Sequence, residues 1–391
     1  MSTAPTRNIS VRTTLNYTQW VPVSLGALDV RDELGYQEAE ILVIPVAPSP
    51  MLALNPEASA LWRQLIGGPV CETTLNETEQ KMLREFGDYG IASTNEDHSF
   101  RVRKLSKSWM LSPQHELVYA LISSLMKRHS VDGVFIKGPV LAAQALREKK
   151  HSGDVDVWGT PECLELLEQE LPKWGWSIQP DVWRETSANH STTFIPSTWG
   201  CEIDLHREFP GFNNVAGKEL LDILDNSHIT KFATAEGRVP APVHNAIIAS
   251  LHLLRPEVGY TVSENRIFEA AEILKSAGPE TYEEACKLNV AVPLRPALRT
   301  VFKGLDLPPI DEGEFDWGWR AAPSRAVAYM RILASTPAKS KARIAWSLLW
   351  PGADVIRSSD VAAGNSTRSL LFARVKRFVR GIRDFIAPRR S

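Results

Sequence analysis

The sequence has few cysteines and no long apolar segment. Its four cysteines are scattered along 391 residues, without the paired spacing of a zinc site or a disulfide framework. No apolar run approaches the roughly 20 residues that a membrane-spanning helix needs. The residues after Met1 also lack the charged, apolar and small-residue order of a signal peptide. We therefore expect a soluble protein of the reducing cytoplasm.

The chain has no strong excess of charge of either sign. Its formal net charge is −2, so composition gives no bias toward nucleic acid, membranes or acidic substrates, and any charge-dependent function must come from local patches. No internal repeat or low-complexity block is present. With 43% hydrophobic residues, the chain can build the cores of two or three ordinary domains.

Changes in residue pattern divide the chain into five parts. We expect a flexible terminus over 1–14, a compact module over 15–105, a core of alternating strands and helices over 106–215, a mainly helical region over 216–362, and a basic tail over 363–391. This organisation predicts the α+β fold class.

The segment HSGDVDVWG places Asp154 and Asp156 one residue apart. In a strand both would lie on one face, about 7 Å apart at the backbone, with Val155 and Val157 on the other face. Carboxylates held together at the edge of a core destabilise the fold unless a cation offsets them, and Mg²⁺ suits such oxygen ligands. This predicts a divalent-metal site. The alternative is a solvated turn, where most chance Asp-x-Asp pairs occur.

Upstream, a strand-like segment ends at Lys137-Gly138, and Pro139 opens an Ala-rich helix. A strand, a glycine turn and a helix N-terminus form a place that favours an anion, and Lys137 could add its charge to a phosphate. The motif is not a Walker A loop, because the spacer and the Gly-Lys-Ser/Thr ending are absent. The alternative is that Gly138 only turns the chain and Lys137 is solvated.

Downstream, WGCEIDLHREF predicts a second acid-bearing strand, with Glu202, Asp204 and His206 on one face. If it pairs beside the first strand, Asp204 completes a three-carboxylate cluster with Asp154 and Asp156. Such a cluster can hold two divalent ions that orient a nucleoside triphosphate. The alternative is an edge strand whose acids face water.

In their order and spacing, these motifs resemble the nucleotidyltransferases of the DNA polymerase beta superfamily, in particular a bacterial group of uncharacterised nucleotidyltransferases. The resemblance is clearest over 133–206 and continues weakly over most of 106–360. The matching residues are Lys137-Gly138, Asp154-Val155-Asp156, His190 and Asp204-Leu205-His206.

The resemblance implies transfer of a nucleoside monophosphate from a nucleoside triphosphate such as ATP to a hydroxyl or amine of a small molecule or peptide. Mg²⁺ or Mn²⁺ would be the cofactor. Asp154, Asp156 and Asp204 would be the catalytic residues and metal ligands, with Asp204 as third ligand or general base. The other implied site residues are Lys137, Gly138 and Lys150 at the triphosphate, and His190 and His206 as accessory residues.

Three positions depart from the family pattern. Lys137-Gly138 replaces a glycine-serine turn, Lys150 stands where an arginine is usual, and Arg207 replaces an aromatic residue. Lysine meets a phosphate as a point charge but lacks the planar fork of arginine, so these changes bear on substrate choice more than on metal binding. We expect His252, in an apolar helix, to serve packing.

The module over 15–105 contains a helix with clear start and stop signals. Asn55 would cap it, Pro56 would be its first residue, and Gly67-Gly68 would end it. The segment is similar to PqqD-like winged-helix modules, which bind leader peptides by adding an extended peptide to a strand edge. The matching residues are Leu54, Asn55, Ala58, Leu61 and Trp62. The alternative is a winged-helix packing module with Leu61 and Trp62 in its core.

The last segment predicts a basic amphipathic helix. Its apolar residues at helical spacing are Leu371, Val375, Phe378, Ile382 and Phe385. Its opposing basic residues are Arg374, Arg377, Arg380 and Arg383. Such a helix could lie on an anionic membrane or contact nucleic acid. We favour docking on the protein's own surface, since the chain has no strong nucleic-acid signal elsewhere.

Two functions follow. The first is a metal-dependent nucleotidyltransferase acting in peptide natural-product biosynthesis. The second is a catalytically inactive leader-peptide-binding or scaffold protein of a peptide-modifying system. The presence of all three carboxylates favours the first.

Overall fold

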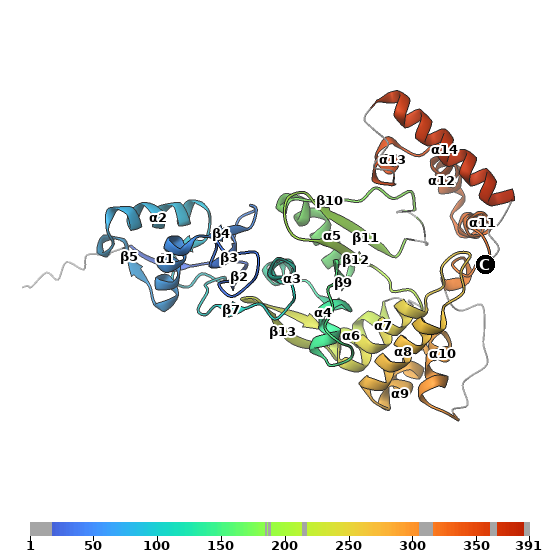
Figure 1. The fold of residues 1–391 in the computed structure, drawn as a ribbon, viewed down its shortest axis with the longest axis horizontal. Helices are drawn as coiled ribbons and strands as arrows, with labels where there is room; N and C mark the ends of the chain where they lie inside the picture. Colours follow the sequence, from blue (N-terminus) through green and yellow to red (C-terminus); the bar gives the residue numbers. More distant parts are fainter. Residues whose placement is uncertain are drawn as a thin grey trace, which may run out of the picture.

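The protein has an N-terminal module, a central sheet and a series of helices toward the C-terminus (Figure 1). This arrangement confirms the predicted α+β class. The computed structural model describes residues 18–183, 186, 189–212, 217–304, 316–359 and 366–386. The flexible terminus expected over 1–14 lies outside the described residues, as do the two ends of the tail expected over 363–391.

The N-terminal module combines two small sheets with two helices. One sheet has the strand order β5-β1-β6 and the other the order β4-β3-β2-β7. The strands are β1 (Gln19–Pro22), β2 (Gly26–Asp29), β3 (Ile41–Ile44), β4 (Leu52–Leu54), β5 (Val70–Cys71), β6 (Ala92–Ser93) and β7 (Ser106–Lys107). The helices are α1 (Pro56–Gly67) and α2 (Glu77–Asp88).

Local signals determine where α1 begins and ends. Oδ1 of Asn55 accepts a hydrogen bond from the N–H of Ala58 at 2.9 Å, and Pro56 is the first helical residue. The predicted N-cap is therefore confirmed, and the helix ends at Gly67 as expected. In α2, Leu83 and Phe86 are buried and face the module's core.

The central sheet has five strands in the order β10-β11-β12-β9-β8. The contact between β9 and β12 is parallel, and the other three strand pairs are antiparallel. The strands are β8 (Gly133–Ile136), β9 (Asp154–Gly159), β10 (Trp176–Ile178), β11 (Ser191–Pro196) and β12 (Glu202–His206). The helices in this part are α3 (Pro113–His129), α4 (Gly138–Ala143) and α5 (Pro161–Glu170).

Each face of this sheet belongs to a different hydrophobic core. Val155 and Val157 of β9 pack with α3 and α5 on one face, whereas Trp158 packs with Phe209 and Phe212 on the other. The second core also includes buried residues of the helices that follow. β9 is thus held between two cores, because successive side chains of a strand point to opposite faces.

The region after residue 217 is mainly helical, as predicted, but a hairpin that was not predicted follows its first helix. β13 (His228–Phe232) and β14 (Ala235–Val239) pair antiparallel. Polar residues interrupt their apolar pattern, so the sequence carries little strand signal there. The helices are α6 (Lys218–Asp225), α7 (Pro242–Leu254), α8 (Glu264–Ala277), α9 (Glu280–Lys287), α10 (Ala291–Val301), α11 (Arg325–Ser335), α12 (Ala338–Leu349), α13 (Ala353–Ser359) and α14 (Thr367–Ile386).

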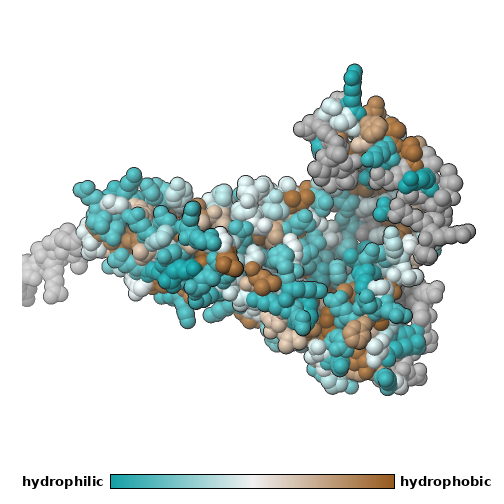
Figure 2. All heavy atoms as spheres, viewed as in Figure 1, coloured by the Kyte–Doolittle hydropathy of each residue, from teal (hydrophilic) through white to brown (hydrophobic). Residues whose placement is uncertain are grey.

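α14 is the amphipathic helix that was predicted near the end of the chain. It packs against α11 and α13 and buries Ala373 with Ile356. Its apolar residues stay half exposed, with 50% for Leu371, 49% for Val375 and 48% for Phe378. Figure 2 shows apolar residues among polar ones on this unit, at upper right. Docking on the protein's own surface therefore covers only part of the predicted apolar face.

None of the described helices combines the length and apolar character needed to cross a bilayer. The four cysteines are all free.

Candidate functional site

Two acidic strands lie side by side at the centre of the sheet. The parallel ladder of β9 and β12 pairs Asp156 with Asp204 and Asp154 with Glu202. Val155 and Ile203 point into the core under α3 and α5, so the acids face the opposite side, as the alternation predicted. The predicted pairing of the two acid-bearing strands is therefore confirmed.

Asp156 is the buried centre of this site, with 4% of the residue exposed. Its Oδ1 accepts hydrogen bonds from Nζ of Lys137 and from Nε2 of His206, both at 2.7 Å. Burial alone would raise the pKa of the Asp156 carboxyl. The charge of Lys137 and the hydrogen bond from His206 outweigh burial and hold that pKa well below its usual range. Asp156 is therefore ionised at neutral pH.

Asp204 and His206 complete a compact group of ligand atoms. Asp156, Asp204 and His206 each place one ligand atom within 4.8 Å of the others, and we refer to these residues as the Asp156 cluster. Thr193 of β11 donates a short hydrogen bond from Oγ1 to Oδ1 of Asp204. Asp156 is thus paired with a cation, Lys137, whereas Asp204 accepts a hydrogen bond from a neutral hydroxyl, that of Thr193.

Asp154 lies at the start of β9 and outside the Asp156 cluster. Oγ of Ser152 lies 3.2 Å from its Oδ1. Burial and the negative charges of Asp156 and Asp204 raise the pKa of the Asp154 carboxyl. The nearby positive charge is therefore too small to offset burial and the neighbouring acids. Its role as a metal ligand stays a prediction.

Lys137 has an unusual backbone conformation that directs its side chain to Asp156. Its φ of 58° and ψ of −137° lie in a region that residues other than glycine rarely adopt. Its N–H donates to Oδ1 of Asn245 in α7 at 2.8 Å. A Cβ on the next residue, Gly138, would come within 2.8 Å of the Tyr119 hydroxyl, so this close approach requires glycine.

The helix after this turn is shorter than the Ala-rich sequence predicts. α4 ends at Ala143 because Ala145, with a φ of 57°, turns the chain and Leu146 donates its N–H to the carbonyl of Leu141. The ammonium of Lys137 is engaged by Asp156. Contact of Lys137 and Gly138 with a triphosphate therefore stays a prediction.

Lys150 and His252 have different surroundings. Lys150 is exposed and its Nζ pairs with Oε1 of Glu269 at 3.2 Å. Its contact with a triphosphate stays a prediction. Burial, together with the charges of Lys137 and Arg255, lowers the pKa of His252 to about 3. His252 is thus a neutral imidazole, which agrees with the expected packing role.

His190 lies directly beside the Asp156 cluster. The centroid of its ring is 5.8 Å from that of His206. Nη1 of Arg255 lies 3.3 Å from its Nε2, and Nη2 of Arg320 lies 3.2 Å from its Nδ1. Two guanidinium groups therefore converge on this side of the cluster, from residues that the sequence analysis did not identify.

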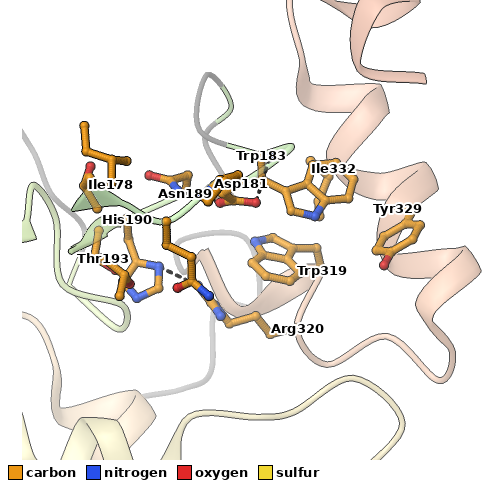
Figure 3. A pocket seen from close by; sticks show the side chains of 14 residues that line it. Ile178, Asp181, Trp183, Asn189, His190, Thr193, Trp319, Arg320, Tyr329 and Ile332 are labelled. Atoms are coloured by element: carbon orange, nitrogen blue, oxygen red, sulfur yellow. Dashed lines mark hydrogen bonds between the residues drawn. The ribbon is translucent and has the colours of Figure 1, made fainter. Parts of the chain in front are cut away.

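A pocket of about 410 Å³ opens beside His190 and Thr193 (Figure 3). We name it the aromatic pocket after Trp183, Trp319 and Tyr329, which form part of its wall. Its two sides come from the segment before β11 and from the region around α11. Sequence reasoning missed it because these segments are about 130 residues apart, the separation of His190 and Arg320.

The donor set of the site fits a divalent metal ion. Among the described residues, Lys137 forms an ion pair with Asp156, and His206 contacts the same carboxylate. Asp154, Asp156 and Asp204 place three carboxylates close together on two neighbouring strands. Carboxylates suit Mg²⁺ and Mn²⁺, and the imidazole of His206 also admits later transition metals. The Asp156 cluster could therefore hold a metal ion.

A second group of possible ligands joins α6, α7 and α9. It consists of Asp222, His244 and Glu284. Nζ of Lys287 lies 3.0 Å from a carboxylate oxygen of both Asp222 and Glu284, and Nε2 of His244 lies 2.9 Å from Glu284. Lys287 bridges the two acids and His244 contacts one of them, so we interpret the group as an ion network between helices.

In the N-terminal module, the residues matched to PqqD-like modules serve the core. Leu61 and Trp62 are buried, and Nε1 of Trp62 donates to the carbonyl of Ile91 at 2.9 Å. This agrees with the packing alternative for those two residues. Capture of a leader peptide stays a prediction.

No family model matches the chain, and no curated protein matches it. Among solved structures, the chain is similar to the crystal structure of an antigenic nucleotidyltransferase-like protein from Paracoccidioides brasiliensis. The identity is 12% and the TM-score 0.33, over 49% of this chain and 93% of that one. A TM-score this low supports no argument about fold or activity.

Proposed function

We propose that this protein is a metal-dependent nucleotidyltransferase that moves a nucleoside monophosphate from a nucleoside triphosphate to a hydroxyl or amine. The observation that supports this most is the direct pairing of Asp156 with Asp204 on parallel strands, with Asp154 two residues earlier. Three carboxylates lie on these two strands, and Lys137 forms an ion pair with one of them, Asp156. Such an arrangement is suited to phosphoryl chemistry, where positioning and charge neutralisation do most of the work.

Bound Mg²⁺ or Mn²⁺ would orient the triphosphate and neutralise charge that develops on the transferred group. Asp204, oriented by Thr193, would accept the proton of the acceptor as its oxygen or nitrogen forms a bond to the α-phosphorus. The bond from that phosphorus to the bridging oxygen breaks, and pyrophosphate leaves with the electron pair.

Pyrophosphate release tests this proposal. The purified protein would be incubated with Mg²⁺ or Mn²⁺, each ribonucleoside triphosphate and a panel of small-molecule and peptide acceptors, with mass spectrometry of the acceptors. Asp156→Asn and Asp204→Asn should lose release by about 100-fold or more, and circular dichroism checks that each variant is folded. Asp97→Asn, an exposed loop residue, is the matched control. Release that survives in both site variants contradicts the proposal.

A second candidate is a non-catalytic protein that binds a leader peptide or acts as a scaffold. Two observations favour it. Asp156 is already satisfied by Lys137 and His206. A groove of about 660 Å³ also lies between the N-terminal module, α3 and the β13–β14 hairpin. We refer to it as the basic groove, and its cationic residues are Arg101, Arg103, Lys104, Lys107, Lys127 and Lys231.

The basic groove would suit an acidic peptide segment, because a single acid, Glu236, lies among its lining residues. If the acceptor were a peptide, one protein could both bind that peptide and transfer a nucleotide to it. Metal-dependent nucleotide binding, measured by calorimetry, separates them, since only the first candidate requires it.

A further inference from the structure

We propose that the aromatic pocket binds the base of the nucleoside triphosphate. This rests on the function proposed above and names the part of the protein that would recognise the nucleotide. The pocket and the Asp156 cluster would then be two ends of one binding site, with the phosphates between them.

Strand pairing makes the pocket continuous with the cluster. Across the β11–β12 ladder, Thr193 pairs with Asp204 and Ser191 pairs with His206. Both Thr193 and Ser191 line the pocket, and Thr193 also donates to Asp204. The pocket therefore begins one strand away from the carboxylates, within the span of a single nucleotide.

The walls of the pocket offer flat aromatic surfaces. The rings of Trp183 and Tyr329 lie with centroids 5.0 Å apart and planes tilted by 52°. The indole of Trp319 lies opposite Trp183 in Figure 3 and is covered on one side by the guanidinium of Arg320, 4.2 Å from the ring centroid. Every nucleobase has a π-face that can stack on such surfaces, and stacking is a main source of affinity for unpaired bases.

The floor of the pocket carries polar groups held in place by one another. Nδ2 of Asn189 donates to Oδ2 of Asp181 at 2.8 Å, and Oδ1 of Asp181 accepts from the N–H of Trp183 at 3.0 Å. This leaves the amide oxygen of Asn189 as an acceptor that could face the amino group of a base. Fixed polar groups beside apolar walls are typical of small-ligand pockets, whose usual volumes include 410 Å³.

The positive charges lie where the phosphates would run. His190 lies between the pocket and His206, and it brings Arg255 and Arg320 to the same side. Guanidinium groups recognise phosphate oxygens through paired donors. An acceptor that offers only a hydroxyl or an amine would make no use of them, so the charge pattern favours the nucleotide as the occupant.

Calorimetry with inorganic tripolyphosphate as the base-free probe tests the inference. The full chain would be titrated, in Mn²⁺ or Mg²⁺, with each of the four ribonucleoside triphosphates and with tripolyphosphate. The variants are Trp319→Leu and Trp183→Leu. The matched control is Trp346→Leu in α12, because this residue is 65% exposed and does not line the pocket. Circular dichroism and thermal unfolding check that each variant is folded.

We expect the preferred triphosphate to bind wild type at least about 10-fold more tightly than tripolyphosphate. Trp319→Leu and Trp183→Leu should reduce this ratio by about 10-fold without changing the affinity for tripolyphosphate. A ratio unchanged in both variants, or a wild type that binds the two probes equally, would overturn the inference while leaving the proposed function standing. A wild type that binds neither probe would overturn the proposed function and this inference with it.

Discussion

The ammonium of Lys137 and the carboxylate of Asp156 form a buried ion pair at 2.7 Å. Their side chains are 12% and 5% exposed. Removing either partner would leave the other charge buried and unpaired, which strongly destabilises a fold. The pair explains why the unusual backbone conformation of Lys137 is retained. A substitution of Lys137 therefore tests how much this ion pair stabilises the fold.

Lys137→Met should destabilise the fold by about 3–5 kcal/mol at pH 7, because Asp156 stays buried without its cation. The folded-state pKa of Asp156 is lowered, so the stabilisation is present above the unfolded pKa of about 4 and is lost as pH falls through the folded pKa. The gap between wild type and variant should therefore shrink in acid. Urea unfolding measures it.

Lys150→Met is the matched control, because Lys150 forms an exposed pair with Glu269 that should contribute less than about 1 kcal/mol. A Lys137→Met protein as stable as Lys150→Met would show that the buried pair does not hold the site.

The raised pKa of the Asp154 carboxyl predicts how metal binding depends on pH. Its folded-state pKa is raised, so its ionisation opposes folding, and that penalty grows as pH rises from the unfolded pKa through the folded pKa. A divalent cation relieves the penalty. The rise in Tm caused by Mn²⁺ should therefore be larger at pH 7.5 than at pH 5, approaching the equivalent of about 2.7 kcal/mol at 100 times Kd.

In Asp154→Asn this pH dependence should weaken, whereas Asp97→Asn should behave as wild type. Differential scanning fluorimetry gives the comparison. An Mn²⁺ effect that is the same at both pH values, or that is absent, speaks against a carboxylate metal site.

Thr193→Val should lower turnover by about 10-fold with a small effect on stability, since valine keeps the shape but cannot orient Asp204. Thr230→Val in β13 is a control in another strand, remote from the site. Steady-state kinetics of pyrophosphate release would show a fall in kcat at a similar KM. Equal rates for the two variants would mean that Asp204 needs no such orientation.

Charge reversal in the basic groove tests the peptide candidate. Lys104→Glu with Lys127→Glu should weaken binding of a fluorescent polyglutamate peptide by about 10-fold at low salt, and the difference should fade as salt rises. Lys341→Glu in α12 is the control. Fluorescence anisotropy that shows no binding by wild type would remove the groove as a peptide site.

The parts of this protein that follow from neighbouring residues were predictable from the sequence. Asn55 caps α1 because a side chain and an N–H three residues on suffice to do so. Asp156 and Asp204 share a sheet face because alternation along a strand is local. Both features could be predicted without knowing which residues from distant parts of the sequence lie nearby.

Features that depend on distant partners could not be predicted in this way. The ion pair of Lys137 with Asp156 is an example, because it depends on an unusual backbone conformation and on a contact with Asn245 in α7. Arg255 and Arg320 meet His190 only after the helical region folds back on the sheet. Trp319 carried no motif at all.

β9 is packed against a hydrophobic core on each face, and this fixes the strand that carries Asp154 and Asp156. Residues 148–151 are exposed and sit between two anchored segments. Lengthening or shortening this connection should therefore reshape the approach to the site without shifting the acids. Packing thus fixes the strand that carries the acids, whereas the loop before it could differ in length.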